Sequence, residues 1–131
     1  MLTREQARQM LTKTLKYSTF PECSINIDES EQAFVRFANN GVTTAGFTVE
    51  RTITVVATRE GKSGISQTTE TTDDALRAAV RRAEQLAAIA PPNPEHLPLP
   101  GPQKYAEYEN FDERTAQARS PEMIPQVKAI I

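Results

Sequence analysis

The residues that could carry chemistry in this 131-residue chain are few and lie far apart in the sequence. A hydrolytic zinc site needs three protein ligands, commonly two histidines one helical turn apart with a glutamate base between them. The chain has a single histidine, His96, which lies among Pro94, Glu95 and Pro98. Such an extended segment gives a metal ligand no rigid support, so we expect His96 to be a surface residue.

Cys23 is the only cysteine, which excludes an internal disulfide and a thiolate metal cluster. It opens a predicted strand, with no histidine nearby and no helix N-terminus to lower its pKa. We therefore expect a small core residue, not a nucleophile. A chain with one unpaired cysteine fits a reducing compartment, and we predict a cytoplasmic protein.

The segment Gly61-Lys62-Ser63-Gly64 has the composition of a phosphate-binding loop but not its Gly-x-x-x-x-Gly-Lys-Ser/Thr spacing. It also joins two predicted strands instead of a strand and a helix. A hairpin turn explains it better. No serine lies in a Gly-x-Ser-x-Gly elbow, and one histidine would have to serve every triad.

Asp73 and Asp74 are adjacent at a predicted helix start, where they point about 100° apart and cannot converge on one substrate atom. Arg77, Arg81 and Arg82 form a basic face on the same helix, which is either solvated or a docking surface for another domain or subunit. The sequence thus predicts no catalytic, cofactor-binding or metal-binding residue in this chain.

The overall charge also excludes classes of function. Fifteen basic and 17 acidic residues give a net charge of −2, which supplies no field to attract a phosphate backbone. No stretch approaches the 18 or more apolar residues of a membrane span. We expect no nucleic-acid partner and no membrane insertion.

The elements that must position these residues begin with a helix over residues 3–17, started by a Thr3/Gln6 capping box. Alternating residues predict a strand over Cys23–Ile27. Apolar groups on both faces, interrupted only by Arg36, predict a more central strand over Ala33–Ala38, and a turn over Asp28–Gln32 separates the two. Asn39-Asn40-Gly41 marks a tight turn, because these residues tolerate left-handed backbone angles.

A long strand follows over Phe47–Thr58. One face carries apolar residues, namely Phe47, Val49, Ile53, Val55 and Ala57, and the other is rich in threonine. Arg51 interrupts the apolar face, and we expect it near an edge where its head reaches solvent. A short strand over 65–69 completes a four-stranded antiparallel sheet.

Thr72 caps a second helix over 73–90, whose apolar stripe includes Leu76, Ala79, Val80, Ala83, Leu86 and Ala87. The sheet has one strongly apolar face, so both helices should cover that face. The predicted fold is therefore an α+β unit, α-β-β-β-β-α, over residues 1–90.

Six prolines between Pro91 and Pro102 hold the following chain extended and end this folded unit. Residues 91–119 should have little regular structure and be pinned to a core by Tyr105, Tyr108 and Phe111. Ser120-Pro121-Glu122 starts a further helix over 120–131, which tolerates Pro125 in its first turns. We expect this truncated helix to lead to a missing C-terminal domain.

The order of these segments resembles the N-terminal domain of the TldD/PmbA family, formerly called modulators of DNA gyrase. The resemblance runs from the capped first helix through Arg36-Phe37-Ala38-Asn39-Asn40, the Gly61–Gly64 turn, the helix over 78–87 and the segment 91–105 with Leu97-Pro98-Leu99-Pro100-Gly101-Pro102. No single motif is specific, whereas the order and spacing together are.

The resemblance implies a noncatalytic N-terminal domain of a metal-dependent peptidase or of its peptidase-like partner subunit. In that family a larger C-terminal domain holds a His-Glu-x-x-x-His motif and a later cysteine in the peptidase branch. None of these ligands matches a position here, so zinc would belong to the missing domain and only the full-length parent could be a zinc metallopeptidase. The implied partners are that domain, a second subunit in a homo- or heterodimer, and an extended peptide substrate.

An alternative from a different class is a free-standing module that binds an extended peptide or protein strand along its sheet edge. The threonine-rich face of the strand over Phe47–Thr58 motivates it, and the unfinished C-terminal helix counts against it. The sequence does not distinguish a parent with the metal motif from one without it, nor name the peptide or the oligomeric state.

Overall fold

A computed structural model describes residues 2–130 and divides them into two compact units. Unit 1 comprises the chain up to Glu29 together with Arg51–Pro102. Unit 2 comprises Ser30–Glu50 together with the chain from Gln103 onward. Met1 and Ile131, which the predicted segments 1–90 and 120–131 included, lie outside the described residues.

The first helix, α1 (Arg4–Leu15), begins as its capping box predicts. Thr3 Oγ1 accepts from the Gln6 backbone N–H at 3.2 Å, and the Gln6 side chain accepts from the Thr3 N–H at 2.9 Å. The buried side of α1 carries Thr14, whose hydroxyl donates to the Met10 carbonyl at 2.7 Å. Ala7, Met10 and Leu11 are partly buried on this helix, whereas Leu15 is 43% exposed.

The sheet has three strands, not the predicted four, because β1 (Glu22–Ala38) is continuous through Asp28–Gln32. That segment contains no glycine or proline to reverse the chain. Its Glu29 carboxylate instead accepts from Arg51 Nε at 2.7 Å. The acidic residues therefore lie on a strand, and Arg51 is held by an ion pair on the central strand instead of reaching solvent at an edge.

Both predicted turns are present, and each connects two neighbouring strands. Asn39 and Asn40 have φ of 51° and 57° between β1 and β2 (Gly41–Arg59). Glu60 and Gly61 have φ of 55° and 72° between β2 and β3 (Lys62–Thr68). Two successive left-handed residues define the hairpin turns that match strand twist. The strand order is β1-β2-β3, and Val56 lies opposite Ile65 in the antiparallel β2–β3 pair.

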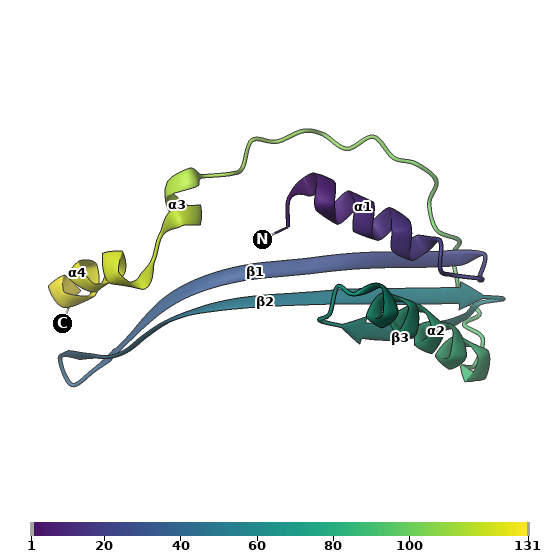
Figure 1. Cartoon of the computed structure of the whole chain (residues 1–131), viewed down its shortest axis with the longest axis horizontal. Helices are drawn as coiled ribbons and strands as arrows, with labels where there is room; N and C mark the ends of the chain where they lie inside the picture. The colour runs from purple at the N-terminus through teal and green to yellow at the C-terminus, as the bar shows by residue number, and fades with distance from the viewer. Residues whose placement is uncertain (1, 131) are drawn as a thin grey trace. The chain divides into compact units, whose positions relative to one another are not determined.

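Helix α2 (Asp73–Ile89) packs on the β3 side of the sheet (Figure 1). Its cap is Thr72, whose Oγ1 accepts from the Ala75 N–H at 3.3 Å. Its buried residues, all on the predicted stripe, are Leu76, Ala79, Val80, Ala83 and Ala87, whereas Leu86, also predicted on that stripe, is 41% exposed. Gly64 permits the contact, because a Cβ on it would lie 2.1 Å from the Ala83 carbonyl oxygen and 2.4 Å from the Ala87 nitrogen.

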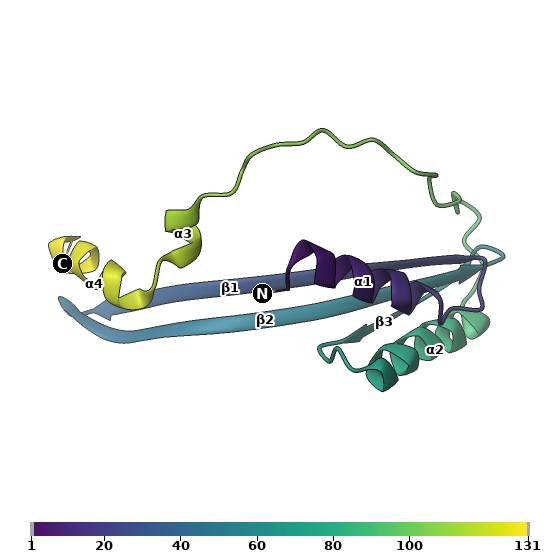
Figure 2. The same cartoon turned by 45° about the horizontal axis from the view of Figure 1, so that its top comes forward.

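The hydrophobic core of unit 1 joins α2 to the inner face of β2. Val55 and Ala57 pack against Ala79, Val80 and Ala83, with partly buried Tyr17, Phe20, Cys23 and Ile25 around them. Helix α1 lies beside α2 on this face of the sheet (Figure 2), where Lys13 Nζ lies 2.6 Å from the Asp73 carboxylate. The α+β class is confirmed, with a three-stranded sheet.

Unit 2 contains two helices, α3 (Glu113–Gln117) and α4 (Ser120–Ile130). The helix start at Ser120 was predicted, and α3 was not. Its signal was Asp112, whose carboxylate caps it by accepting from the Thr115 N–H at 2.7 Å. Tyr105, Tyr108 and Phe111 are at least three-quarters exposed, so the prediction that they pin this segment to a core is wrong.

Candidate functional site

His96, the one histidine, attaches the proline-rich segment to unit 1. Its Nε2 lies 3.0 Å from the Glu22 carboxylate at the start of β1, and the Leu99 N–H donates to the same carboxylate at 3.1 Å. These two bonds, that of His96 first, lower the pKa of Glu22. The Asn93 N–H also donates to the Gly61 carbonyl at 2.8 Å. His96 therefore has a structural contact that the sequence did not indicate.

Cys23 lies half-buried at the start of β1, against the core of unit 1. Burial raises the pKa of its thiol, which a hydrogen bond with Ser18 only partly opposes. A thiol with a raised pKa is protonated at neutral pH and is a poor nucleophile. These surroundings agree with the prediction that Cys23 is a core residue and not a nucleophile.

The two aspartates at the start of α2 serve the helix instead of a substrate. Asp73 binds Lys13 of α1 through both carboxylate oxygens, at 2.6 and 2.7 Å, and this bond raises the pKa of Lys13. Asp74 lies in the same first turn, where an acid is favourable. Asp73 therefore links α2 to α1, and the charge of both aspartates is favourable at the start of α2.

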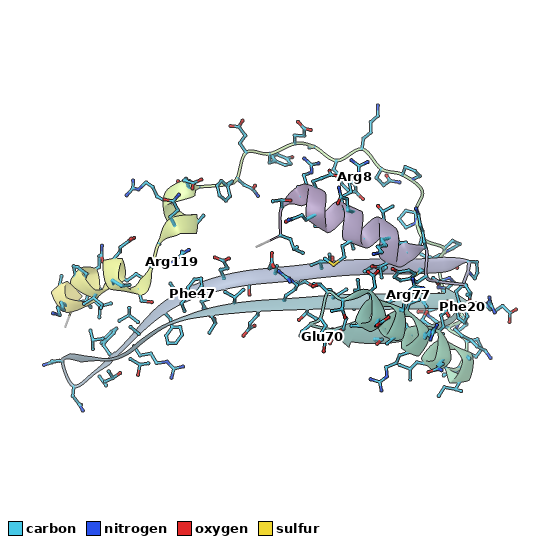
Figure 3. All side chains as sticks on the ribbon, in the orientation of Figure 1. Arg8, Phe20, Phe47, Glu70, Arg77 and Arg119 are labelled. Carbon is cyan, nitrogen blue, oxygen red and sulfur yellow. The ribbon has the colours of Figure 1, made fainter. Side chains whose placement is uncertain are left out.

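The basic face of α2 divides into two parts. The Arg77 guanidinium lies over the Tyr17 ring, 4.1 Å from its centroid, and so packs α2 against the end of α1 (Figure 3). Arg81 and Arg82 are exposed, and within residues 2–130 neither forms a salt bridge. Only these two remain available to a partner.

The Glu84 side chain holds the connection between α1 and β1. Its Oε1 accepts from the Thr19 N–H at 2.6 Å, from Ser18 Oγ at 3.0 Å and from Thr19 Oγ1 at 3.1 Å. Arg59 covers the adjacent Phe20 ring at 4.1 Å and donates to the Thr19 carbonyl. Each polar group here has a structural partner, so this cluster is not a reactive site.

The hairpin in unit 2, formed by Ser30–Ala38 of β1 and Gly41–Glu50 of β2, exposes large apolar side chains. Phe37, Phe47 and Val49 are 50%, 44% and 55% exposed. Exposed apolar side chains are notable when they are large and lie on one small hairpin. We name these three residues the hairpin patch.

Helix α4 is fastened to this hairpin by its first residues. Ser120 Oγ donates to the Gly46 carbonyl at 2.6 Å, and the Arg119 guanidinium lies 4.8 Å from the Phe47 ring centroid (Figure 3). Arg119 also lies 3.9 Å from the Glu31 carboxylate. Across the hairpin the Phe34 ring covers Gly46, leaving no room for a Cβ there.

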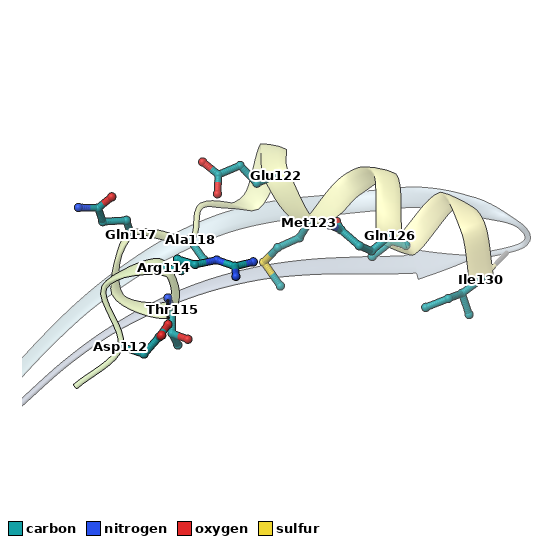
Figure 4. Close-up of a pocket in the computed structure, with 10 residues that line it drawn as sticks. Asp112, Arg114, Thr115, Gln117, Ala118, Glu122, Met123, Gln126 and Ile130 are labelled. Carbon is teal, nitrogen blue, oxygen red and sulfur yellow. Dashed lines mark hydrogen bonds between the residues drawn. The ribbon is translucent and has the colours of Figure 1, made fainter. Parts of the chain in front are cut away.

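Beyond its start, α4 leaves its apolar side only partly covered. A groove of about 710 Å³ lies between α3 and α4, with Met123, Val127 and Ile130 along it and Arg114 beside it (Figure 4). Only Ser120 of α4 is buried, and Ile130 is 76% exposed. Within the described residues this helix therefore packs poorly, and its start at Ser120 agrees with the sequence.

The side chains present do not fit a zinc site of the kind the resemblance implies. Among residues 2–130, no three His, Cys, Asp or Glu side chains lie close enough together to hold a metal ion. His96 is paired with Glu22, and Cys23 faces the core. No helix within the described chain is long and apolar enough to cross a membrane.

Comparison with solved structures shows a shared fold. The crystal structure of TldE from Thermococcus kodakarensis superposes with a TM-score of 0.78 over 94% of this chain, at 16% sequence identity. The match covers 27% of the TldE chain, so the present chain spans about a quarter of that protein's length. No curated protein matches the sequence.

Comparison with protein families supplies the sequence evidence. Residues 23–87 match the family described as PmbA/TldA metallopeptidase domain 1. The matched segment begins at Cys23 in β1 and ends at Ala87 in α2, so it spans the three-stranded sheet except Glu22 and most of the helix that covers it. The chain belongs to the PmbA/TldD family and carries its first domain.

Proposed function

We propose that this chain is the noncatalytic first domain of a TldD/PmbA-type peptidase or peptidase-like subunit, where it serves subunit assembly and the access of extended peptides. The observation that carries the proposal is the family match over residues 23–87, the segment that builds the sheet and α2. The chain spans about a quarter of the length of TldE, which leaves room in such a protein for a further domain.

The hairpin patch supplies a physical means for assembly. Its three side chains are exposed to solvent. Removing apolar area from water contributes about 25 cal/mol per Å², against which stands the entropic cost of association. The apolar side of α4 offers a second, only partly covered area in the same unit. We propose that a second subunit or the C-terminal domain of the parent covers these surfaces.

The proposal keeps the division into an N-terminal domain over 1–90, an extended segment over 91–119 and a helix from 120 that leads to a C-terminal domain. It places any zinc in that last domain. We propose a cytoplasmic location, because a single unpaired cysteine fits a reducing compartment.

Metal analysis and a peptidase assay of the purified chain test the noncatalytic role. We expect less than stoichiometric zinc after dialysis and no cleavage of unstructured peptides. One tightly held zinc per chain, or cleavage that a chelator abolishes, contradicts the proposal. Reading the residues encoded after Ile131 for a His-Glu-x-x-x-His helix then tells whether the parent is itself a peptidase.

The assembly role is tested on the parent protein with Phe37→Ser and Val49→Ser in the hairpin patch. We expect subunit association to weaken at least tenfold in sedimentation experiments. Ile89→Ser is the control, because Ile89 is 82% exposed in unit 1 and lies outside the patch. If the Phe37→Ser and Val49→Ser proteins associate as tightly as the Ile89→Ser control, the hairpin patch is not part of the subunit interface.

The second candidate, a free-standing module that binds an extended strand, is favoured by one observation. Both β1 and β3 are edge strands of the sheet, with backbone groups open to an added strand. An expressed reading frame that ends at Ile131 supports this candidate, and a longer one contradicts it.

A further inference from the structure

The outer edge of β3 borders a groove that the assembly role does not use. β3 is the last strand of the β1-β2-β3 sheet, and α2 packs over it through the contact at Gly64. The groove, about 660 Å³, runs between the end of β3 and the first half of α2, both in unit 1. It therefore has a strand edge along one wall and a helix along the other.

The wall formed by α2 carries small side chains at one end and basic side chains at the other. Ala75, Ala78 and Ala79 line the groove and carry no side chain beyond Cβ, so an added backbone can approach the edge of β3. Arg81 and Arg82 follow on the same wall. Both guanidinium groups are free of salt bridges within residues 2–130.

The strand wall lacks the features that usually protect an edge. Natural edge strands carry charges that oppose a further strand, and β1 has Glu22, Asp28, Glu29 and Glu31 along its length. β3 reads Lys-Ser-Gly-Ile-Ser-Gln-Thr, with a charge only at its first residue, Lys62. Of the two edges, β3 is the more receptive.

Acidic residues at the opposite end of the groove set a direction. Glu70 follows β3 and Asp74 lies in the first turn of α2, so the groove is negative where α2 begins (Figure 3). Arg81 lies seven residues after Asp74, which is roughly 10 Å along a helix. An extended ligand meets negative charge at one end and positive charge at the other.

We propose that the groove between β3 and α2 binds an extended acidic segment of another polypeptide, which adds a strand to β3 and places its carboxylates beside Arg81 and Arg82. Backbone hydrogen bonds to β3 supply affinity that does not depend on sequence, and the two arginines select acidic side chains. Glu70 and Asp74 repel those side chains from the other end. This binding site is independent of the hairpin patch and of the assembly role.

The probe is a fluorescein-labelled, N-acetylated octapeptide of alternating threonine and valine, with two threonines near one end replaced by glutamate. Fluorescence anisotropy measures its affinity for the whole chain. We expect the glutamate peptide to bind at least tenfold more tightly than the same peptide with two lysines. A glutamate peptide with N-methylated alternate amides, which keeps its charges and loses backbone donors, should not bind.

Two variants locate the site. Arg81→Glu with Arg82→Glu should reverse the preference, so that the lysine peptide binds more tightly. Ala78→Leu should fill the groove and abolish binding, since Ala78 is exposed and leucine is a good helix former. The matched controls are Arg4→Glu with Arg8→Glu on the exposed side of α1, and Ala88→Leu on an exposed position of α2 outside the groove.

Hydrogen exchange completes the test, because bound peptide should protect outward-facing amides of Lys62–Thr68 and not those of β1. Circular dichroism confirms that each variant is folded. The proposal is overturned if no peptide binds at millimolar concentration, or if the double arginine variant keeps the charge preference of the unmodified chain. It is also overturned if the Ala78→Leu variant binds the peptide as tightly as the unmodified chain, or if the peptide protects amides of β1. Equal binding of the N-methylated peptide also overturns it.

Discussion

The two units contain parts of the same two strands and differ in what covers them. In unit 1, Ile53, Val55 and Ala57 of β2 are fully buried beneath the helices. In unit 2, Phe47 and Val49 of the same strand and the same alternation are about half exposed. Ser120 is the only buried side chain among the described residues of unit 2. Unit 1 therefore has a packed core, whereas unit 2 leaves large apolar side chains exposed to solvent.

This difference shows what alternation of apolar residues measures. A period of two specifies which side chains share a face of a sheet, and the burial of Ile53, Val55 and Ala57 agrees with it in the second half of β2. It carries no information on whether that face meets a helix in the same chain or a surface elsewhere. Helix α2 supplies the cover in unit 1 because its alanines and Gly64 allow close approach.

The largest expected effect comes from closing that approach. Gly64→Ala places a Cβ against the backbone of α2, at Ala83 and Ala87, where no side-chain movement can relieve the clash. We expect a loss of about 3 kcal/mol or more in the free energy of unfolding. Urea denaturation followed by circular dichroism measures it.

Gly101→Ala is the matched control, since nothing lies within 4 Å of a Cβ at that position. We expect a change of about 0.5 kcal/mol or less. A similar loss in both variants would show that α2 does not rest on β3 through Gly64.

The next effect compares the two units along a single strand. Ile53→Ala removes a fully buried side chain and should cost about 3 kcal/mol of unfolding free energy through lost burial and a cavity. Val49→Ala, four residues earlier on the same face, should cost about 0.5 kcal/mol because its side chain already meets solvent. Comparable losses would mean that unit 2 has a core of its own.

Local sequence signals predicted the elements of unit 1 well. Thr3 with Gln6, Thr72 and the glycine-containing turn at Gly61 each specify a backbone conformation over a few residues, and all three occur as expected. The error was to treat the polar run Asp28–Gln32 as a turn. Glu29 is stabilised on the strand by Arg51, 22 residues away in sequence, and no local pattern reveals such a pairing.

The candidate site residues also differ in whether the local sequence reveals their role. Arg81 and Arg82 were correctly identified as part of a basic face, because helical spacing places them together. The partner of Arg77 on the Tyr17 ring and that of His96 at Glu22 depend on contacts between distant segments. The exposure of the hairpin patch was missed, because its residue types are those of a buried strand.

A smaller effect tests the fastening of α4 within unit 2. Ser120→Ala removes the hydroxyl that donates to the Gly46 carbonyl and should cost about 1 kcal/mol. Hydrogen exchange of hairpin amides near Gly46 should accelerate roughly fivefold, while those of β3 in unit 1 keep their rates. Ser30→Ala, an exposed serine on the same hairpin, is the control. Equal acceleration in β3 would show that the two units open together.

The smallest effect concerns the segment from Asn93 to Leu99, which hydrogen bonds attach to the rest of unit 1. The pKa of Glu22 is lowered from its ordinary value of 4.5 by the His96 side chain and then by the Leu99 N–H. A lowered pKa in the folded state means that the stabilisation is complete above 4.5 and is lost as the pH falls through the lowered value. Amide exchange at Leu99, corrected for its intrinsic pH dependence, should therefore show a step on acidification below 4.5. Glu22→Gln should lose that step, because an amide does not titrate in this range. A step of equal size in the Glu22→Gln protein would assign it to another carboxylate, and the attachment of this segment would then not depend on Glu22.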